Sequence, residues 1–518
     1  MKTLFKCLLM TSLIASSLIY LTGCNDDDDP GPQLTGDNKT YVLGPVSNPA
    51  ISGSVTFAER DDDQIVITIQ LSGTQAGSSH PAHIHANSAA EGGGIVLDLT
   101  AVNGADGKSE TVVNALNDGT ALTYDDLLAF DGYVNVHLSS ADLNTLIAQG
   151  DIGDNELTTE VKEYELGPVS DPNINGTATF TKRVNGETLV AVALTGTADG
   201  ESYPSHIHSN SAAETGGIII DLSNVDGTSG MAKTNVSQLN DGTAITYEEL
   251  LDLDGYLNVH FGSGLIAQGD IGANELTGDT KVYQMTPVAD PAVTGTTTFA
   301  KRKNGNTLVT VALTGTQAGA IHPSHIHANT IAEGGGIVID LNDVDGTTGM
   351  AKTTVKQLND GTAITYEELL DFNGYLNVHT GGTFVAQVDI GQNELTGDKK
   401  EYALNEVSGS GVSGTATFEK RKNGKTQITL SLQGTTDGGD HPAHIHANDA
   451  ATGGGIVLDL NNVVGATGIS VTSANALNDA TPITYDELIA YNGYINVHES
   501  PASLSTLLAQ GNIGSNAP

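Results

Sequence analysis

Cysteine is almost absent from this chain of 518 residues, which contains only Cys7 and Cys24. Cys7 lies in an apolar run, residues 7–21, that follows a short basic region and leads to Leu-Thr-Gly before Cys24. A basic region, an apolar run and small residues before a cysteine are typical of a bacterial lipoprotein signal. We therefore expect residues 1–23 to be removed and Cys24 to be lipidated. The mature protein then lacks disulfide bonds, although its compartment would permit them.

A long apolar run is also missing. The run in the signal is short and interrupted by Ser and Thr, which disfavours the alternative interpretation as a transmembrane helix, since such a helix needs about 20 apolar residues. Residues 24–38 are acidic and rich in Pro and Gly, and we expect them to form a solvated tether. The sequence thus predicts a protein of the cell envelope that faces away from the cytoplasm. Its partner is a bacterial membrane, with the outer membrane or the cell surface favoured over the inner membrane.

Basic residues are scarce as well. The chain has 21 Lys and Arg against 62 Asp and Glu, and loss of two signal lysines leaves a mature charge of −43. Such a charge repels nucleic acid and anionic headgroups, which excludes nucleic acid as a partner. No Ser or Cys nucleophile and no repeated acid–base pair of carboxylates stands out. The run Gly92-Gly93-Gly94 lacks the lysine of a phosphate-binding loop, and we interpret it as a flexible turn.

The chain does contain a fourfold internal repeat. Similar phrases begin at Tyr41, Tyr164, Tyr283 and Tyr402, which are 123, 119 and 119 residues apart. A repeat of this length suits an independent domain and exceeds the roughly 20–45 residues of a solenoid repeat. We expect four tandem domains, joined by short polar links, at residues 39–155, 161–275, 280–394 and 399–518.

The pattern within each repeat favours strands. Residues 176–180 and 188–194 are rich in β-branched side chains and flank a turn-like Val-Asn-Gly, and residues 95–99 form a short apolar strand. One helix is expected at residues 123–130, where Thr123 and Asp126 resemble a capping box. The predicted fold class is all-β, with four tandem antiparallel β-sandwich or barrel domains and one short helix in each.

All fifteen histidines belong to one constellation that recurs in every repeat. Residues i and i+2 of a strand share a face, so the members of each His-x-His pair point together, and the distant His, 52 residues further on, converges with them if its strand is adjacent. The histidine across the proline could supply a fourth nitrogen, and a tyrosine replaces it in the second repeat. The candidate ligands are His80, His83, His85 and His137; Tyr203, His206, His208 and His260; His322, His325, His327 and His379; and His441, His444, His446 and His498.

Converging neutral imidazoles suit Zn(II), Cu(II) or Ni(II), whereas Ca(II) and Mg(II) need oxygen ligands. We therefore expect a transition-metal site in each repeat, with zinc or copper as the cofactor. The alternative is that these histidines only bond loop carbonyls and fix strand ends. Asp98, with its counterparts in the other repeats, either supports a histidine from behind or bonds a loop amide, and we favour the second role. The tyrosine makes the second site the one expected to be most altered.

Three phrases of the first repeat together resemble the CHRD domain, the repeated module of chordin that also occurs in bacterial secreted proteins. They are His83-Ile84-His85, the glycine run before Ile95-Val96-Leu97, and Gly132-Tyr133-Val134-Asn135-Val136-His137. The resemblance covers residues 40–515 and implies an extracellular β-rich module without an established reaction. One departure is the closing phrase at residues 148–152, which lacks the family's usual arginine. The cysteine-rich modules of chordin are also absent, so binding of growth factors is not implied.

A fainter similarity concerns the copper site of Cu/Zn superoxide dismutase, which also uses His-x-His and a remote His. No histidine lies between His85 and His137, so the bridging and zinc-binding residues of that enzyme have no counterpart. The predicted function is a non-enzymatic, membrane-anchored binding or structural lipoprotein with an extracellular protein partner still to be identified. The alternatives are a copper-dependent redox enzyme and an adhesion or spacer array with structural histidines.

Overall fold

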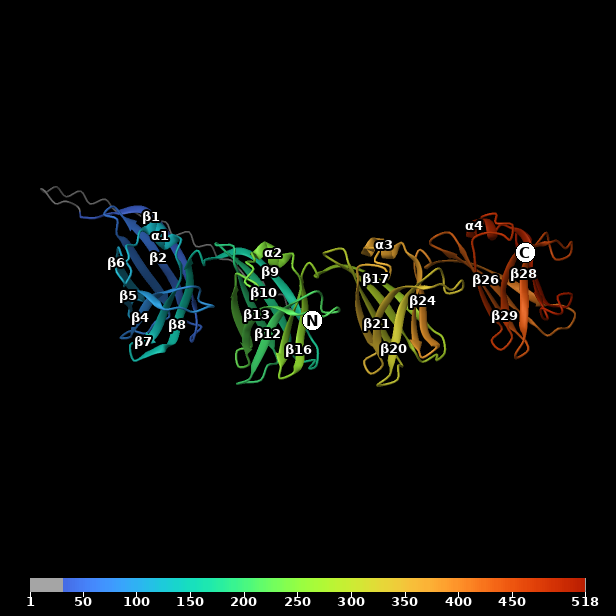
Figure 1. The fold of residues 1–518 in the computed structure, drawn as a ribbon, viewed down its shortest axis with the longest axis horizontal. Coiled ribbons are helices and arrows are strands. Elements are labelled where there is room, and N and C mark those ends of the chain that lie inside the picture. The colour runs from blue at the N-terminus through green and yellow to red at the C-terminus, as the bar shows by residue number, and fades with distance from the viewer. Residues whose placement is uncertain (1–30, 518) are drawn as a thin grey trace. The chain divides into compact units, whose positions relative to one another are not determined.

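The computed structural model describes residues 31–517, which form four consecutive closed antiparallel barrels of eight strands each (Figure 1). The predicted signal and Cys24 lie outside the described residues. Within the described residues, no helix has both the length and the apolar character needed to cross a bilayer. The all-β prediction with four tandem domains is confirmed, and each domain is a closed barrel, one of the two forms expected.

The first barrel brings two distant strands side by side. Its strands follow the order β1-β2-β3-β6-β5-β4-β7-β8, and β1 pairs with β8 to close it. β4 therefore lies between β5 and β7. The elements are β1 (Leu34–Pro45), β2 (Ser52–Arg60), β3 (Ile65–Ser72), β4 (Ser79–Ala86), β5 (Ile95–Asn103), β6 (Lys108–Val113), α1 (Tyr124–Leu128), β7 (Asp131–Ser139) and β8 (Asp142–Gly153).

The other three barrels repeat this order. The second contains β9 (Leu157–Pro168), β10 (Asn175–Arg183), β11 (Thr188–Thr195), β12 (Ser202–Ser209), β13 (Ile218–Asp226), β14 (Met231–Val236), α2 (Tyr247–Leu251), β15 (Asp254–Phe261) and β16 (Gly264–Gly272). The third contains β17 (Leu276–Pro287), β18 (Thr294–Arg302), β19 (Thr307–Thr314), β20 (Ile321–Ala328), β21 (Ile337–Asp345), β22 (Met350–Val355), α3 (Tyr366–Leu370), β23 (Asn373–Thr380) and β24 (Thr383–Gly391). The fourth contains β25 (Leu395–Glu406), β26 (Ser413–Arg421), β27 (Thr426–Gln433), β28 (Asp440–Ala447), β29 (Ile456–Val464), β30 (Ile469–Ala474), α4 (Tyr485–Leu488), β31 (Asn492–His498) and β32 (Leu507–Gly514).

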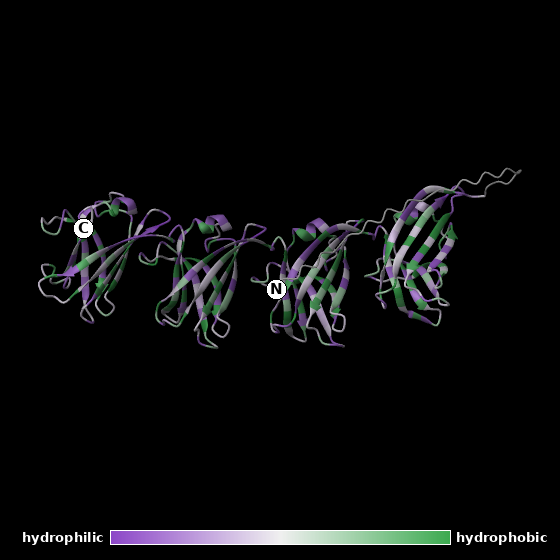
Figure 2. Ribbon diagram, turned by 180° about the vertical axis from the view of Figure 1, so that it is seen from behind, coloured by the Kyte–Doolittle hydropathy of each residue, from purple (hydrophilic) through white to green (hydrophobic). Residues whose placement is uncertain are grey.

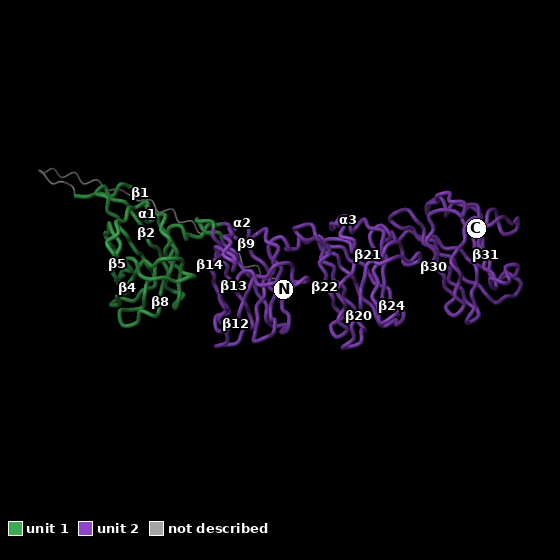
Figure 3. The backbone as a smooth tube through the Cα atoms, viewed as in Figure 1, with its two compact units in different colours: residues 1–159, 182–186 green, residues 160–181, 187–518 purple. Residues whose placement is uncertain are grey.

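The last residues of the expected tether, 34–38, and most residues of the expected links belong to strands. β1 begins at Leu34, and the first strands of the next barrels begin at Leu157, Leu276 and Leu395. The chain divides into two compact units (Figure 3). One unit contains residues 1–159 and 182–186, and the other contains residues 160–181 and 187–518.

Alternating side chains fill the interior of each barrel. In β3 the buried residues Ile65, Ile67, Ile69 and Leu71 alternate with more exposed ones, because successive side chains of a strand point to opposite faces. The same alternation along the strands is visible in Figure 2. The buried apolar residues form four separate clusters, one in each barrel. Since burying one large apolar side chain contributes roughly 1.5–3 kcal/mol, each barrel has a stabilising core of its own.

The short helix of each barrel begins as the sequence predicts. The hydroxyl of Thr123 accepts a hydrogen bond from the backbone N–H of Asp126, and the Asp126 carboxylate accepts one from the backbone N–H of Thr123. This capping box recurs at the start of α2, α3 and α4. It satisfies two N–H groups that a helix start leaves without intrahelical partners.

Three arginines at the ends of β10, β18 and β26 have completely buried side chains: Arg183, Arg302 and Arg421. The Arg302 guanidinium donates from Nη1 to Asp270 Oδ2 at 2.7 Å and also to the carbonyl of Asn274. The other oxygen of Asp270 accepts a hydrogen bond from the backbone N–H of Ala212, at 2.8 Å. One carboxylate thus ties the loop after β12 to the end of β18. Asp151 and Asp389 occupy the same position opposite the other two arginines.

Candidate metal centre

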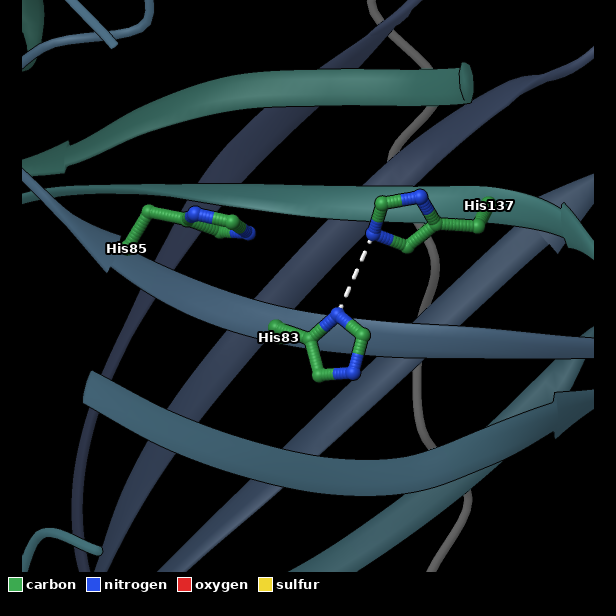
Figure 4. A group of neighbouring side chains, drawn as sticks. All are labelled: His83, His85 and His137. Carbon is green, nitrogen blue, oxygen red and sulfur yellow. Dashed lines mark hydrogen bonds between the residues drawn. The ribbon is translucent and has the colours of Figure 1, made fainter. Parts of the chain in front are cut away.

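The candidate ligands of the first barrel lie on β4 and β7, which pair directly. The register places Ile84 opposite Val134 and Ala82 opposite Val136, and all four of these side chains are buried in the core. The side chains of His83, His85 and His137 therefore project from the outer face of the barrel (Figure 4). They are nonetheless largely covered, with His85 bonded to Gly93 in the loop after β4 and His137 bonded to Leu143 at the start of β8.

Three imidazoles converge in each of the four barrels, and each set offers ligand atoms that lie within 4.8 Å of one another. In the first barrel Nδ1 of His83 is 3.1 Å from Nε2 of His137. Two nitrogens bound to one tetrahedral zinc at about 2.0–2.1 Å would be separated by roughly 3–4 Å. These two nitrogens are already at the separation that a shared ion requires. The four sets are His83, His85 and His137; His206, His208 and His260; His325, His327 and His379; and His444, His446 and His498.

Backbone carbonyls fix the tautomers of two ligands in the first barrel. Nδ1 of His85 is 2.9 Å from the carbonyl of Gly93, and Nδ1 of His137 is 2.6 Å from the carbonyl of Leu143. A carbonyl only accepts hydrogen bonds, so each Nδ1 carries the proton and each Nε2 of the neutral ring keeps its lone pair. This is the arrangement that a metal-binding histidine commonly shows.

His83 has the opposite orientation. The Nε2 lone pair of His137 accepts a hydrogen bond, so His83 donates from its Nδ1–H. Its Nε2 lies 3.7 Å from Asp98 Oδ1, and the equivalent separation is 3.8 Å in the other three barrels. A proton held at Nε2, facing this carboxylate, would free Nδ1 as a third ligand atom. Asp98 also accepts a hydrogen bond from the side-chain amide of Asn117 at 3.0 Å, so both roles considered for it are compatible with the geometry.

Burial keeps several of these imidazoles neutral. Desolvation is the largest influence that lowers the pKa of His83, followed by the nearby ring of His137, whereas Asp98 acts in the opposite direction. Burial likewise lowers the pKa of His137 below its ordinary value. The pKa shifts downward for the same main reason at His260, His379, His444 and His498. Neutral imidazole is the form that binds a metal.

The third barrel gives the most direct test of fit. Nδ1 of His325, Nε2 of His327 and Nε2 of His379 are all buried and, within the described residues, have no hydrogen-bond partner. A buried polar atom left unpaired costs about 1–3 kcal/mol. Three such nitrogens in one set fit a shared partner, and their chemistry suits a borderline transition-metal ion.

The structure places the histidine across the proline outside the ligand set, which corrects its assignment as an optional fourth ligand. His80 precedes His83 by three positions, so its side chain leaves β4 on the opposite face, next to a register shift between His80 and Ala82. Its Nδ1 bonds the carbonyl of Leu138 at 2.9 Å, and its Nε2 is 2.7 Å from the hydroxyl of Ser78. His80 thus braces the backbone beside His137.

The equivalent residues of the other barrels also lie outside the ligand sets, although Nε2 of His322 and of His441 has no hydrogen-bond partner within the described residues. His441 bonds the carbonyl of Glu499 at 2.7 Å, and His322 bonds the hydroxyl of Thr380 at 2.7 Å. The ring of Tyr203 lies against that of Phe261, tilted by 40° with centroids 5.3 Å apart, and its hydroxyl accepts a hydrogen bond from the backbone N–H of Ala198. The three histidines of the second set stay within the same 4.8 Å limit as the other sets. The ring centroids of His206 and His260 are 5.6 Å apart, farther than the corresponding pair in the other three barrels, and the alteration of this site by the exchange stays a prediction.

Sequence reasoning missed the residues that hold the imidazoles. The ring of Tyr133 stacks on His85 with centroids 4.9 Å apart, and its hydroxyl accepts the backbone N–H of Gly93. A Cβ at Gly93 would lie 1.9 Å from the carbonyl oxygen of Ala86, so only glycine fits at this position, from which the carbonyl of Gly93 reaches His85. The glycine run is thus part of the site and not merely a flexible turn. The sequence signal for this role was that the glycine run recurs in the repeats together with the histidines.

The comparisons with known proteins concern this repeated module. Residues 33–141 and 392–502 match the CHRD domain family, so the protein contains CHRD domains in its first and fourth barrels. A comparison with curated proteins gives no match. Among solved structures, the chain is similar to "Biofilm associated protein - BSP domain", at 10% identity over 96% of this chain and 99% of that chain. The TM-score of that likeness is 0.13, which carries no argument about fold or function.

Proposed function

We propose that this CHRD-containing protein is a lipid-anchored, extracytoplasmic metal-binding protein made of four CHRD-like barrels, each holding one zinc or copper ion. One observation carries the proposal: in every barrel, three imidazoles from two neighbouring strands offer ligand atoms within 4.8 Å of one another. The shared strand order supports extending the CHRD assignment from the two matched segments to the second and third barrels.

In the first barrel the ion would be held by Nδ1 of His83 and by Nε2 of His85 and His137. Three protein nitrogens leave one position of a tetrahedral ion open for water or for another ligand. The ion would bind the folded barrel and not the unfolded chain, so it would stabilise the barrel by linkage. The net negative charge of the protein would raise the local concentration of cations around it.

The cell-envelope part of the proposal rests on the sequence before the first barrel. The segment Leu21-Thr22-Gly23-Cys24 supports cleavage and lipidation at Cys24. A Cys24→Ala variant, expressed with the whole chain, is expected to move from the membrane fraction to the soluble extracytoplasmic fraction. Retention of this variant in the membrane fraction would contradict the lipid anchor and leave the metal proposal untouched.

Metal stoichiometry tests the central claim. The purified full-length mature chain is loaded with Zn(II) or Cu(II), desalted and analysed for bound metal, with about four ions per chain expected from the four sets. The variant with His83→Ala, His206→Ala, His325→Ala and His444→Ala is expected to lose them. Fewer than one ion in the parent chain, or an unchanged content in the variant, contradicts the proposal.

The chain itself offers a matched control. His322→Tyr places at the third barrel the residue that the second barrel already carries as Tyr203, and His322 lies outside the ligand set. This variant is expected to retain the full metal content. Turnover of superoxide or peroxide by the copper-loaded parent chain would instead favour the redox enzyme over a binding function.

A further inference from the structure

The four candidate metal centres differ in the loop that follows the remote histidine. Gln149 follows His137 by twelve positions and Gln510 follows His498 by twelve, but Gln268 follows His260 by only eight and Gln387 follows His379 by only eight. Each pair spans the same structural interval, from the remote histidine to the strand beside it. The segment that follows the remote histidine is therefore four residues longer in the first and fourth barrels, and we call it the long loop, although in the first barrel it includes the last residues of β7 and the first residues of β8, where Ser139 pairs with Asp142.

The long loop supplies a hydrogen-bond acceptor to the remote histidine. The carbonyl of Leu143 lies 2.6 Å from Nδ1 of His137, and the carbonyl of Leu504 lies 2.6 Å from Nδ1 of His498. In the second barrel the short hairpin pairs Phe261 directly with Gly264, and in the third Thr380 pairs with Thr383. Within the described residues, no backbone carbonyl bonds the ring of His260 or His379.

The two kinds of loop are accompanied by two kinds of centre. In the first and fourth barrels Nδ1 of the first His of the pair lies 3.1 Å from Nε2 of the remote His, and the ring centroids are 5.0 Å apart in both. The corresponding centroids are 5.6 Å apart in the second barrel and 5.3 Å apart in the third. The side chain of the first histidine is 14% exposed at His83 and His444, but 22% and 21% exposed at His206 and His325.

We propose that the loop length divides the four centres into two classes, with tighter metal binding in the first and fourth barrels and weaker, more readily exchanged metal in the second and third. This inference rests on the proposed metal binding. A carbonyl that holds Nδ1–H fixes the tautomer and orientation of a ligand and raises the basicity of its Nε2, and loss of such a partner typically lowers metal affinity about 10–100-fold. The shorter loops also leave the centres more open to solvent, so water or a competing ligand reaches the ion more easily.

A competition titration of Zn(II) against a chromogenic chelator tests the division on the full-length mature chain. His206→Ala with His325→Ala leaves the two long-loop centres, and His83→Ala with His444→Ala leaves the two short-loop centres. The first variant is expected to bind zinc about 10–100-fold more tightly than the second. Equal affinities, or the reverse order, overturn the division but leave metal binding intact. Failure of the parent chain to bind zinc overturns the proposed function instead.

Loop exchange isolates the cause. In the chain that retains only the short-loop centres, replacing residues 261–264 by the sequence of residues 138–145 gives the second barrel a long loop without touching any histidine. Zinc affinity of that centre is expected to rise about tenfold or more, while the total number of ions stays the same. The converse exchange, residues 138–145 replaced by residues 261–264 in the chain with long-loop centres, is expected to lower it. No change in either direction shows that the loop does not set the affinity.

Discussion

Asp270→Asn should strongly lower the free energy of unfolding of the unit that contains residues 160–181 and 187–518. The Arg302 side chain is completely buried and Asp270 is 17% exposed in its side chain, so the guanidinium depends on this carboxylate for its counter-charge. Asparagine can still accept the N–H of Ala212, but it is neutral. Leaving one partner of a buried ion pair uncompensated typically costs about 3–5 kcal/mol. We expect the lower end, about 3 kcal/mol, because the carbonyl of Asn274 and the hydroxyl of Thr354 still bond the guanidinium.

The fourth barrel provides the control for this experiment. There Asn512 occupies the position of Asp270 and accepts the backbone N–H of Ala450 at 2.9 Å, and within the described residues no arginine faces it. Asp270→Asn combined with Arg302→Met reproduces that neutral arrangement with an unbranched apolar chain in the space of the arginine. The double variant should therefore recover most of the stability lost by the single one.

Differential scanning calorimetry of the metal-free full-length chain measures the effect. For a barrel of this size, a loss of about 3 kcal/mol corresponds to a shift on the order of 10 °C in the transition that involves these barrels. Hydrogen exchange at the Ala212 amide gives a local readout, because this N–H is held by Asp270 itself. A single variant that loses less than about 1 kcal/mol, or a double variant no more stable than the single one, would refute the view that the buried charge dominates this junction.

Three further predictions concern the candidate centres. Zinc at 100 times its Kd should stabilise each barrel by about 2.7 kcal/mol, seen as a zinc-dependent rise in Tm that the fourfold His→Ala variant lacks. Burial lowers the pKa of His83 and His137 below the ordinary 6.5, so the unfolded chain binds more protons than the folded one as the pH falls through that value. The stability of the metal-free chain should therefore be constant above about pH 6.5 and decline below it. Urea unfolding at pH 7.5 and 5.5 measures this, and an equal or greater stability at the lower pH would contradict it. Zinc binding should weaken about tenfold, with little change in Tm, when Asn replaces the aspartates at Asp98, Asp221, Asp340 and Asp459. The small effect on Tm is expected because these side chains are 67–70% exposed. Unchanged affinity in the chelator titration would show that the carboxylates do not support the ligands.

The strand pattern was sufficient to predict the fold class and the face of the strands on which the three histidines lie. Alternation places His83 and His85 on one face, and Ile84, Val134 and Val136 have only the core in which to bury their apolar surface. Those two constraints bring the imidazoles to the same outer face once β4 and β7 are neighbours. The neighbour relation itself was only a condition in the sequence argument. It depends on the closure of the barrel, which no local pattern specifies.

The partners of the imidazoles could not be predicted in the same way. Leu143 acts through its carbonyl, and a carbonyl is common to every residue, so its side-chain identity carries no signal. Gly93 also acts through its carbonyl, and its only sequence signal was the recurrence of the glycine run. His80 was misjudged because a histidine near two others suggests a ligand. Its odd spacing from His83 already places it on the opposite face, and its nitrogens bond Ser78 and the backbone beside His137.

Comparison of the repeats with one another recovers some of what a single repeat conceals. Asp151, Asp270 and Asp389 are each followed 32 residues later by a buried arginine, whereas Asn512 replaces the aspartate where no arginine faces it. Arg60, at the equivalent position of the first barrel, instead bonds Asp62 at 2.9 Å and keeps 19% of its side chain exposed. The aspartate and the buried arginine thus occur together or not at all. This covariation is expected if each charge is tolerated in the interior only because the other neutralises it.

The loops after the remote histidines show a second covariation: His137 and His498, which have the long loop, also have the short nitrogen–nitrogen separation. A difference between repeats that recurs together with a second difference therefore indicates a physical dependence, which is why loop exchange, and not further replacement of histidines, is the decisive experiment on these centres.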